Sequence, residues 1–217
     1  LYRIAGDLKL SPAVFFDNGE HNEVFCRDAQ KVAEELSRTE VDVVYLDPPY
    51  NQHPYGSNYH VLNSIALWDE PQLSKQITGH GDKSAIRRDW RTERRSAYNY
   101  RSEAVNAYRQ LLTTLNARYI LTSYSTDGMI SLGDMLQVNA ERGRVHIEMK
   151  GYKRYRVSSQ RFSQKPMNVE LIIVLDTHGK RSFDVDELLA QVTSTEQRVL
   201  SNHRETSDER QLMLFDR

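Results

Sequence analysis

A carboxylate, two prolines and an aromatic ring follow a hydrophobic run in the first quarter of the chain, in the stretch VVYLDPPYNQ at residues 43–52. Each proline fixes its backbone φ angle and removes a backbone N–H donor. The turn after the run therefore offers hydrogen-bond acceptors, namely the Asp47 carboxylate and carbonyls such as that of Pro48, while Pro49 keeps the loop rigid. Tyr50 places a flat ring beside them. The matching ligand is a planar group that carries an exocyclic amine.

A nucleobase amino group has these properties, and its chemistry explains why acceptors are needed. The nitrogen lone pair is conjugated into the ring, so the amine is a poor nucleophile. Hydrogen bonds from its N–H groups to acceptors raise the electron density on nitrogen. A methyl sulfonium is a fitting electrophile because it leaves as a neutral thioether, and the site then mainly supplies orientation and electrostatics. The alternative interpretation of DPPY is an ordinary turn at the end of a strand.

We call Asp47–Tyr50 the DPPY corner, and the secondary-structure elements expected around it predict an α/β protein. A short buried strand is expected at residues 23–29, ending in Asp28, followed by a helix at 30–38 and a second strand at 41–47. Asp28 and Asp47 would then end neighbouring strands, at the edge where α/β sheets bind ligands. Further helices are expected at 58–69, 102–117 and 130–143, and further strands at 118–125, 144–152 and 169–176. No helix separates the last two strands, so the sheet should be mostly parallel with an antiparallel terminal strand.

Composition bounds the class of protein. The chain has 217 residues, of which 39% are hydrophobic and 27% charged, which suits one soluble domain with a full core. No apolar run has the length of a membrane span. Cys26 is the single cysteine, so an internal disulfide is excluded and a reducing cytoplasm is the natural compartment. The Cys and His residues have no zinc-ligand spacing.

Charge is unevenly distributed in a chain whose net charge is −1. Residues 83–101 hold seven Lys or Arg and two acidic residues, and residues 150–165 hold six Lys or Arg and none. Both segments contain aromatic residues, a mixture that suits a polyanion with stackable rings. A solvated basic surface is the alternative interpretation of each segment taken alone.

The extended block DPPYNQ…YGSNYHVLNSIALWDEP resembles the central block of bacterial adenine-N6 DNA methyltransferases of restriction–modification systems. The shared positions are Asp47–Asn51, Tyr55, Asn58–His60, Leu62 and Asp69–Pro71. VFCRDA, YILTSYS and GYKRYR…NVELIIVL follow in the family's order, and Glu170 resembles a recurrent glutamate. The resemblance implies a Rossmann-like, S-adenosylmethionine-dependent methyltransferase sheet over about residues 20–176 and a duplex DNA substrate.

The resemblance also implies residue roles. Asp47 and the Pro48 carbonyl would bind the adenine N6 amine in a loop made rigid by Pro49, and Tyr50 would stack on a base flipped out of the duplex. Asp28 and Ala29, with Asp47, would bind the cofactor. The residues expected to hold phosphates or read bases are Asn51, Arg87, Arg88, Arg91, Arg94, Arg95, Lys153, Arg154 and Arg156.

One departure from the family pattern concerns the methionine end of the cofactor. Members carry a glycine-rich FxGxG-like segment upstream of this block, and this chain has none. Residues 1–182 are therefore predicted to be the C-terminal portion of a catalytic domain, without its first strands, with a basic DNA-contacting insertion at about 72–101. A missing N-terminal segment or a complementing chain would supply the rest of the pocket.

Residues 183–217 are predicted to be an acidic, polar tail, with a helix near its start and a linker at 201–211. The stretch from Gln211 to Phe215, QLMLF, resembles the peptide by which bacterial replication proteins dock on the sliding clamp. An apolar end that packs on its own domain is the alternative.

Three alternatives to adenine methylation of DNA stay open at this point: cytosine-N4 methylation, an RNA substrate, and a non-catalytic nucleic-acid-binding remnant of such an enzyme.

Overall fold

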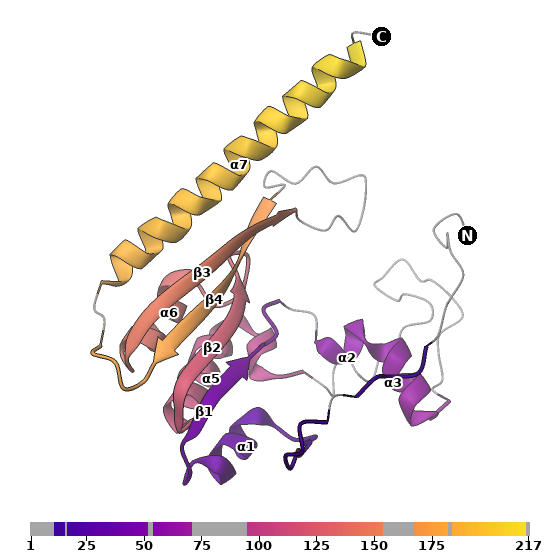
Figure 1. Cartoon of the computed structure of the whole chain (residues 1–217), viewed down its shortest axis with the longest axis vertical. Coiled ribbons are helices and arrows are strands. Elements are labelled where there is room, and N and C mark those ends of the chain that lie inside the picture. Colours follow the sequence, from indigo (N-terminus) through magenta and orange to yellow (C-terminus); the bar gives the residue numbers. More distant parts are fainter. Residues whose placement is uncertain are drawn as a thin grey trace.

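The computed structural model describes residues 11–15, 17–51, 54–70, 95–153, 167–181 and 184–215. Its centre is a four-stranded mixed sheet with the order β1-β2-β4-β3 (Figure 1). The strands are β1 (Val41–Leu46), β2 (Ala117–Ser125), β3 (Arg144–Lys153) and β4 (Met167–Asp176). The helices are α1 (Ala29–Leu36), α2 (Tyr55–Asn58), α3 (His60–Leu67), α5 (Arg101–Thr114), α6 (Leu132–Ala140) and α7 (Val185–Phe215), with a 3-10 turn, η1 (Ala97–Asn99). The α/β class predicted from the sequence is confirmed.

Strand direction differs in part from the prediction of a mostly parallel sheet. β1 and β2 pair in parallel, whereas β4 is antiparallel to both of its neighbours, β2 and β3. Three of the four strands thus run in the same direction, but only one of the three neighbouring pairs is parallel. The cause is the β3–β4 hairpin: its second strand lies between β2 and β3, so the antiparallel strand is internal to the sheet.

The strand predicted at residues 23–29 is wrong. Residues 23–28 adopt no regular structure and Ala29 begins α1, while the side chain of Val24 is 97% exposed and Cys26 is exposed as well. A run of β-forming residues becomes a strand only when another strand pairs with it. In the described part of the chain, β1 pairs with β2 alone, and nothing forms a ladder with residues 23–29.

Asp28 consequently has a different local role from the one expected. It is the N-cap residue of α1, and its carboxylate accepts hydrogen bonds from the backbone N–H groups of Gln30 at 3.0 Å and Lys31 at 3.4 Å. A carboxylate at a helix N-terminus satisfies donors that the helix leaves unpaired and lies at the positive end of the helix dipole. These bonds fix the orientation of the Asp28 side chain.

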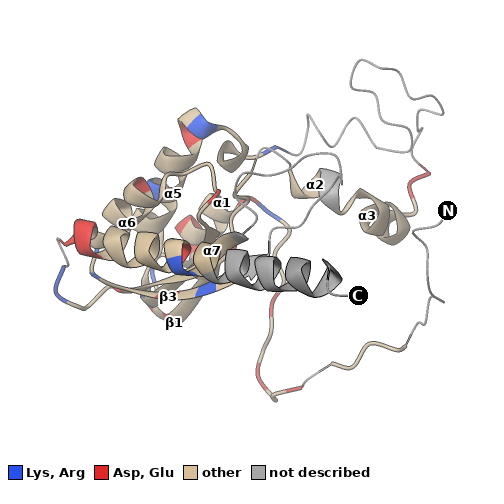
Figure 2. Cartoon of the chain, turned by 90° about the horizontal axis from the view of Figure 1, so that it is seen from above, with Lys and Arg blue, Asp and Glu red and all other residues tan. Residues whose placement is uncertain are grey.

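The core lies between one face of the sheet and the helices α5 and α6 (Figure 2). Side chains alternate along β2, so Ile120, Thr122 and Tyr124 point toward α5 and are buried. The Tyr108 hydroxyl joins these layers, because it hydrogen-bonds Thr122 Oγ1 at 2.8 Å and accepts from Asn139 Nδ2 at 2.9 Å. On the opposite face, Val43 and Tyr45 of β1 are more than half exposed.

The helix expected near residue 185 is confirmed, but the linker expected at 201–211 is wrong. Both belong to α7, which ends at Phe215 and therefore includes the Gln211–Phe215 peptide. α7 packs on α6, β3 and β4, and its Val192 is only 1% exposed. A Cβ atom at Gly151 would lie 2.5 Å from the Val199 side chain, so glycine allows α7 to approach β3 closely.

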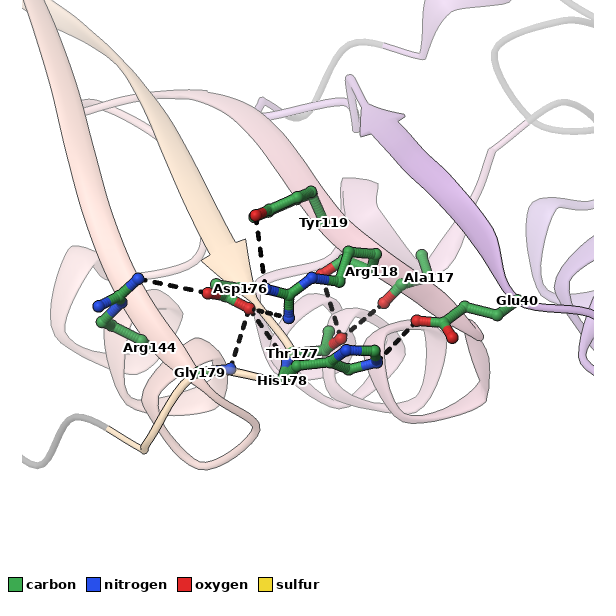
Figure 3. Close-up of polar contacts among 9 residues, drawn as sticks. All are labelled: Glu40, Ala117, Arg118, Tyr119, Arg144, Asp176, Thr177, His178 and Gly179. Carbon is green, nitrogen blue, oxygen red and sulfur yellow. Dashed lines mark hydrogen bonds and ion pairs between the residues drawn. The ribbon is translucent and has the colours of Figure 1, made fainter.

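A carboxylate holds together the end of the sheet that lies farthest from the DPPY corner (Figure 3). Asp176, at the end of β4, accepts from Arg118 Nη1 at 2.5 Å and from Arg144 Nη2 at 3.4 Å. Its Oδ1 also accepts from the backbone N–H groups of His178 at 3.1 Å and Gly179 at 2.9 Å. Asp176 thus joins β2, β3 and the turn after β4.

The predicted helix at 58–69 is confirmed as the pair α2 and α3. The basic insertion predicted at 72–101 lies largely outside the described residues, which resume at Arg95. Acidic and basic residues both occur along α5 and α7 (Figure 2). Among the described helices, none combines the length and the apolar character needed to cross a membrane.

Candidate functional site

The DPPY corner leaves the sheet at the carboxyl end of β1. Leu46 is the last paired residue of the strand, opposite Thr122, and Asp47 is the first residue beyond it. Asp47 is exposed and Pro48 is buried. The prolines therefore anchor a loop whose acidic side chain faces outward.

Two hydrogen bonds and one ring contact hold the loop in place. The Tyr50 carbonyl accepts from the Met129 N–H at 2.8 Å, and the Asn51 carbonyl accepts from Asn99 Nδ2 at 3.0 Å. The Tyr50 ring lies edge-on to the ring of Tyr124, with centroids 6.3 Å apart. The loop thus presents its acceptors in a fixed geometry, and this arrangement lowers the entropic cost of ligand binding.

A cavity of about 360 Å³ lies on one side of the corner. Asp28 and Ala29 from the start of α1 meet Asp47, Pro48 and Pro49 on its wall. The remaining wall is mainly aromatic and aliphatic: Tyr45, Leu46, Tyr55, Ser96, Tyr98, Tyr108 and Leu111. The structure therefore brings Asp28 and Asp47 to one cavity, and Asp28 reaches it from a helix cap and not from the strand end that the sequence predicted.

A second cavity, of about 350 Å³, lies on the other side of the corner. Its wall contains Tyr50, Asn51, Ser123 and Glu170, together with Tyr59. Asp47, Pro49 and Tyr55 line both cavities. The Asp47 carboxylate consequently stands at the boundary between a largely apolar cavity and a more polar one.

Two tyrosines of these walls keep their phenolic protons at neutral pH. Burial, and then the negative charge of Asp47, raises the pKa of Tyr55 to about 12. Burial is also the main reason that the pKa of Tyr98 is raised, with smaller contributions from Tyr108 and Asp28. Both hydroxyls are therefore available as hydrogen-bond donors. Within the described structure, the Tyr98 hydroxyl is buried and makes no hydrogen bond.

Sequence reasoning assigned no role to Ser123, Tyr98 or Ser96. Tyr98 and Ser96 lie in a segment whose strongest sequence signal is its positive charge. Ser123 occupies a strand, where a lone serine has no distinguishing pattern. Their proximity to Asp47 results from strand register and from the packing of η1 against α5.

Two of the predicted basic DNA-binding residues lie in the described part of the chain. The Arg95 guanidinium lies over the Tyr100 ring, 4.6 Å from its centroid. Lys153 pairs with Met167 at the end of the β3–β4 hairpin. Arg87, Arg88, Arg91, Arg94, Arg154 and Arg156 lie outside the described residues.

The fold and the site define an α/β protein in which three carboxylates, those of Asp28, Asp47 and Glu170, and several tyrosines line two cavities beside the sheet. Residues 5–126 match the model of the D12 class N6 adenine-specific DNA methyltransferases, and the chain belongs to this family. The resemblance noted in the sequence is thereby confirmed.

Curated relatives agree with this assignment. The chain is 33% identical over 149 residues to the type II methyltransferase M.NlaIII of Neisseria lactamica, an alignment that covers 69% of this chain and 40% of that protein. It is 33% identical over 156 residues to the modification methylase StsI of Streptococcus sanguinis, covering 70% and 22%. It is 36% identical over 128 residues to M.FokI of Planomicrobium okeanokoites, covering 59% and 18%. The chain therefore spans less than half the length of these relatives. No solved structure gives a significant match.

Proposed function

We propose that this chain carries the base-binding part of an enzyme that transfers a methyl group from S-adenosylmethionine to the N6 amine of adenine in duplex DNA. The observation that carries the proposal is the position of Asp47 on the walls of both cavities. A methyl transfer needs the acceptor nitrogen and the donor to meet in line at short range. A carboxylate at the boundary of two adjoining cavities is placed to hold the acceptor at that meeting point.

The first cavity, which Asp28 and Asp47 line with mainly apolar side chains, fits the adenosine part of the cofactor. Its apolar wall suits a planar ring, and Asp28 offers carboxylate oxygens to hydroxyl or amino groups. The two backbone N–H groups that bind Asp28 leave acceptor capacity on this carboxylate, since an ionised carboxylate has about four lone-pair sites. The Tyr98 hydroxyl, buried without a partner in the described structure, adds a donor close by. When bound, the cofactor supplies an electrophilic methyl group.

The polar cavity fits the target base. Tyr50 provides a ring on which a flipped base stacks, and Asp47, with the Pro48 carbonyl, accepts the N–H bonds of its exocyclic amine. These bonds counteract the conjugation of the amine with the ring, which makes its nitrogen a better nucleophile. Asn51 contacts the flipped nucleotide or steadies the loop through its carbonyl bond to Asn99.

DNA itself would be held by the basic residues of the segments 83–101 and 150–165. Arg87, Arg88, Arg91, Arg94 and Arg95 would bind phosphates or read bases, as would Lys153, Arg154 and Arg156. A segment with local positive charge can bind DNA even though the chain as a whole is close to neutral. Cytosine-N4 methylation and RNA methylation use the same amine chemistry and are alternatives, and a non-catalytic DNA-binding remnant is a third.

The decisive experiment uses the full-length protein and measures methyl transfer from labelled S-adenosylmethionine to unmethylated DNA. The methylated nucleoside is then identified. N6-methyl-2′-deoxyadenosine is the expected product, and Asp47→Ala should lower the rate at least about 100-fold, the scale of lost electrostatic stabilisation in active sites. Asp42→Ala is the matched control, because Asp42 is an exposed carboxylate on the same strand. Full activity of Asp47→Ala would refute the mechanism, and N4-methylcytosine would refute the substrate.

For the tail, we propose that residues Gln211–Phe215 dock on a bacterial sliding clamp. The resemblance of QLMLF to a clamp-binding peptide supports this idea, although these residues continue α7. Clamp pull-downs should weaken when Gln211, Leu214 and Phe215 are changed to alanine. Equal capture by this variant and the unmodified chain would end the proposal.

A further inference from the structure

Ser123 lies beside Asp47 because of the register of β1 and β2. Leu46 pairs with Thr122, so the next residues, Asp47 and Ser123, are neighbours across the parallel pair. Side chains alternate along β2, and Thr122 points toward α5, where it bonds the Tyr108 hydroxyl. The Ser123 side chain therefore points to the opposite face of the sheet, away from the helical layer.

The same face carries Glu170. It pairs with Ser125 across β2 and β4, while its neighbour Leu171 is in the core. Asp47, Ser123 and Glu170 thus line one cavity of about 350 Å³, together with the Tyr50 ring. Among the described residues, the Ser123 hydroxyl has no hydrogen-bond partner, and it is only partly buried, so a ligand in the cavity can reach it.

The cavity consequently presents an acceptor next to a hydroxyl that can donate. Asp47, when ionised, only accepts hydrogen bonds, whereas a serine hydroxyl donates one. An adenine presents the complementary edge: N6–H donates and the adjacent ring nitrogen N1 accepts. A base with a carbonyl oxygen in place of the amine would direct its lone pairs at those of the carboxylate, and two acceptors cannot form a hydrogen bond.

We propose that Ser123 is a specificity-determining residue whose hydroxyl donates a hydrogen bond to N1 of the target adenine while Asp47 accepts from N6. This inference rests on the proposed function. It deepens that function because one bond to N1 and one to N6 fix the rotation of the base in its plane. Rotation in the plane decides whether the amine nitrogen points at the adjoining cavity that is proposed to hold the methyl donor.

The test compares transfer rates on three duplexes that contain the recognition site found in methylated plasmid DNA. The target base is adenine, 1-deazaadenine, which lacks the N1 acceptor, or 7-deazaadenine, which keeps it. Ser123→Ala should lower kcat/KM on adenine by about 2- to 12-fold, the loss expected for one neutral hydrogen bond. On 7-deazaadenine the loss should be equal. On 1-deazaadenine the variant and the unmodified protein should be equally active, because the bond is already absent.

This comparison is a double-mutant cycle, so the intrinsic effect of removing a ring nitrogen cancels. Ser123→Thr keeps a hydroxyl and should restore discrimination between adenine and 1-deazaadenine. Ser125→Ala is the matched control, because Ser125 lies on the same strand but its hydroxyl donates to Asp127 at 2.7 Å. For this variant, the ratio of kcat/KM on adenine to kcat/KM on 1-deazaadenine should equal that of the unmodified protein.

Equal losses of Ser123→Ala on adenine and 1-deazaadenine would overturn the inference and leave the proposed function intact. If the loss caused by Ser123→Ala were absent on 7-deazaadenine and present on 1-deazaadenine, the assignment of the bond to N1 would be overturned. An unmodified protein that methylates no adenine in any DNA would overturn the proposed function and this inference together.

Discussion

Replacement of Asp176 by alanine tests how the sheet is held together at the end opposite the site. The Asp176 side chain is only 10% exposed, and its partner Arg118 is 31% exposed. Truncation would leave the Arg118 guanidinium without its carboxylate and the His178 N–H without its acceptor (Figure 3). The Gly179 N–H would lose its bond to the carboxylate and keep its 3.1 Å bond to the Asp176 backbone carbonyl. Arg144 is 68% exposed and 3.4 Å away, so its contribution should be small.

The expected magnitude follows from these contacts. Breaking a largely buried ion pair by removing one partner costs about 3–5 kcal/mol, most of it from the charge left unpaired. For a chain of this length, each kcal/mol lowers the melting temperature by about 2–4 °C, so Asp176→Ala should lower it by about 6–20 °C. Asp176→Asn keeps one acceptor oxygen for the turn and should cost less, about 1.5–3 kcal/mol for the lost charged hydrogen bond.

Thermal and urea unfolding followed by circular dichroism would measure these changes. Glu40→Gln is the matched control, because Glu40 pairs with His178 at 2.7 Å while both side chains are about half exposed. Such surface pairs contribute about 0–1 kcal/mol. If Asp176→Ala unfolded within 1 kcal/mol, as an order of magnitude, of the unmodified protein, the view that this carboxylate joins β2, β3 and the turn would be refuted.

Two further predictions concern tyrosines of the core and site. Tyr108→Phe removes the hydroxyl that bonds Thr122 and Asn139, both fully buried, and should lower the free energy of unfolding by about 1–3 kcal/mol in urea titrations; an unchanged midpoint would contradict it. Burial raises the pKa of Tyr108 and Tyr55 to about 12, above the ordinary value of 10.0. Because the folded-state pKa is the higher one, the associated stability is complete below pH 10 and is lost as the pH rises toward 12. Phenolate absorbance should show Tyr55, Tyr98 and Tyr108 titrating later than ordinary tyrosines in the folded protein, because burial raises the pKa of each, and a single ordinary titration would contradict this.

Much of the fold was predictable from local sequence patterns. The β-branched run at Val41–Leu46, the β3–β4 pairing and the positions of α5, α6 and the start of α7 were predictable, because periodicity and propensity act within a few residues. The DPPY corner was predictable for the same reason, since prolines constrain the backbone wherever they occur. These features need no knowledge of what packs against them.

The remaining features of the fold depend on contacts between residues that are distant in the sequence. Residues 23–29 read as a strand but form none, because a strand exists only with a ladder partner. The polar run at 201–211 reads as a linker, yet it continues the helix that starts at Val185.

The sequence by itself determined the chemistry of the corner: a carboxylate, two prolines and a stacking ring at the end of a hydrophobic strand. Only the tertiary structure decided its surroundings, which are Asp28 on one side of Asp47, and Ser123 with Glu170 on the other. The physical reason is the separation along the sequence over which each effect acts. Proline geometry and side-chain type act over neighbouring residues, whereas strand register and packing bring together residues such as Asp47 and Glu170, more than a hundred positions apart, and no local pattern encodes that proximity.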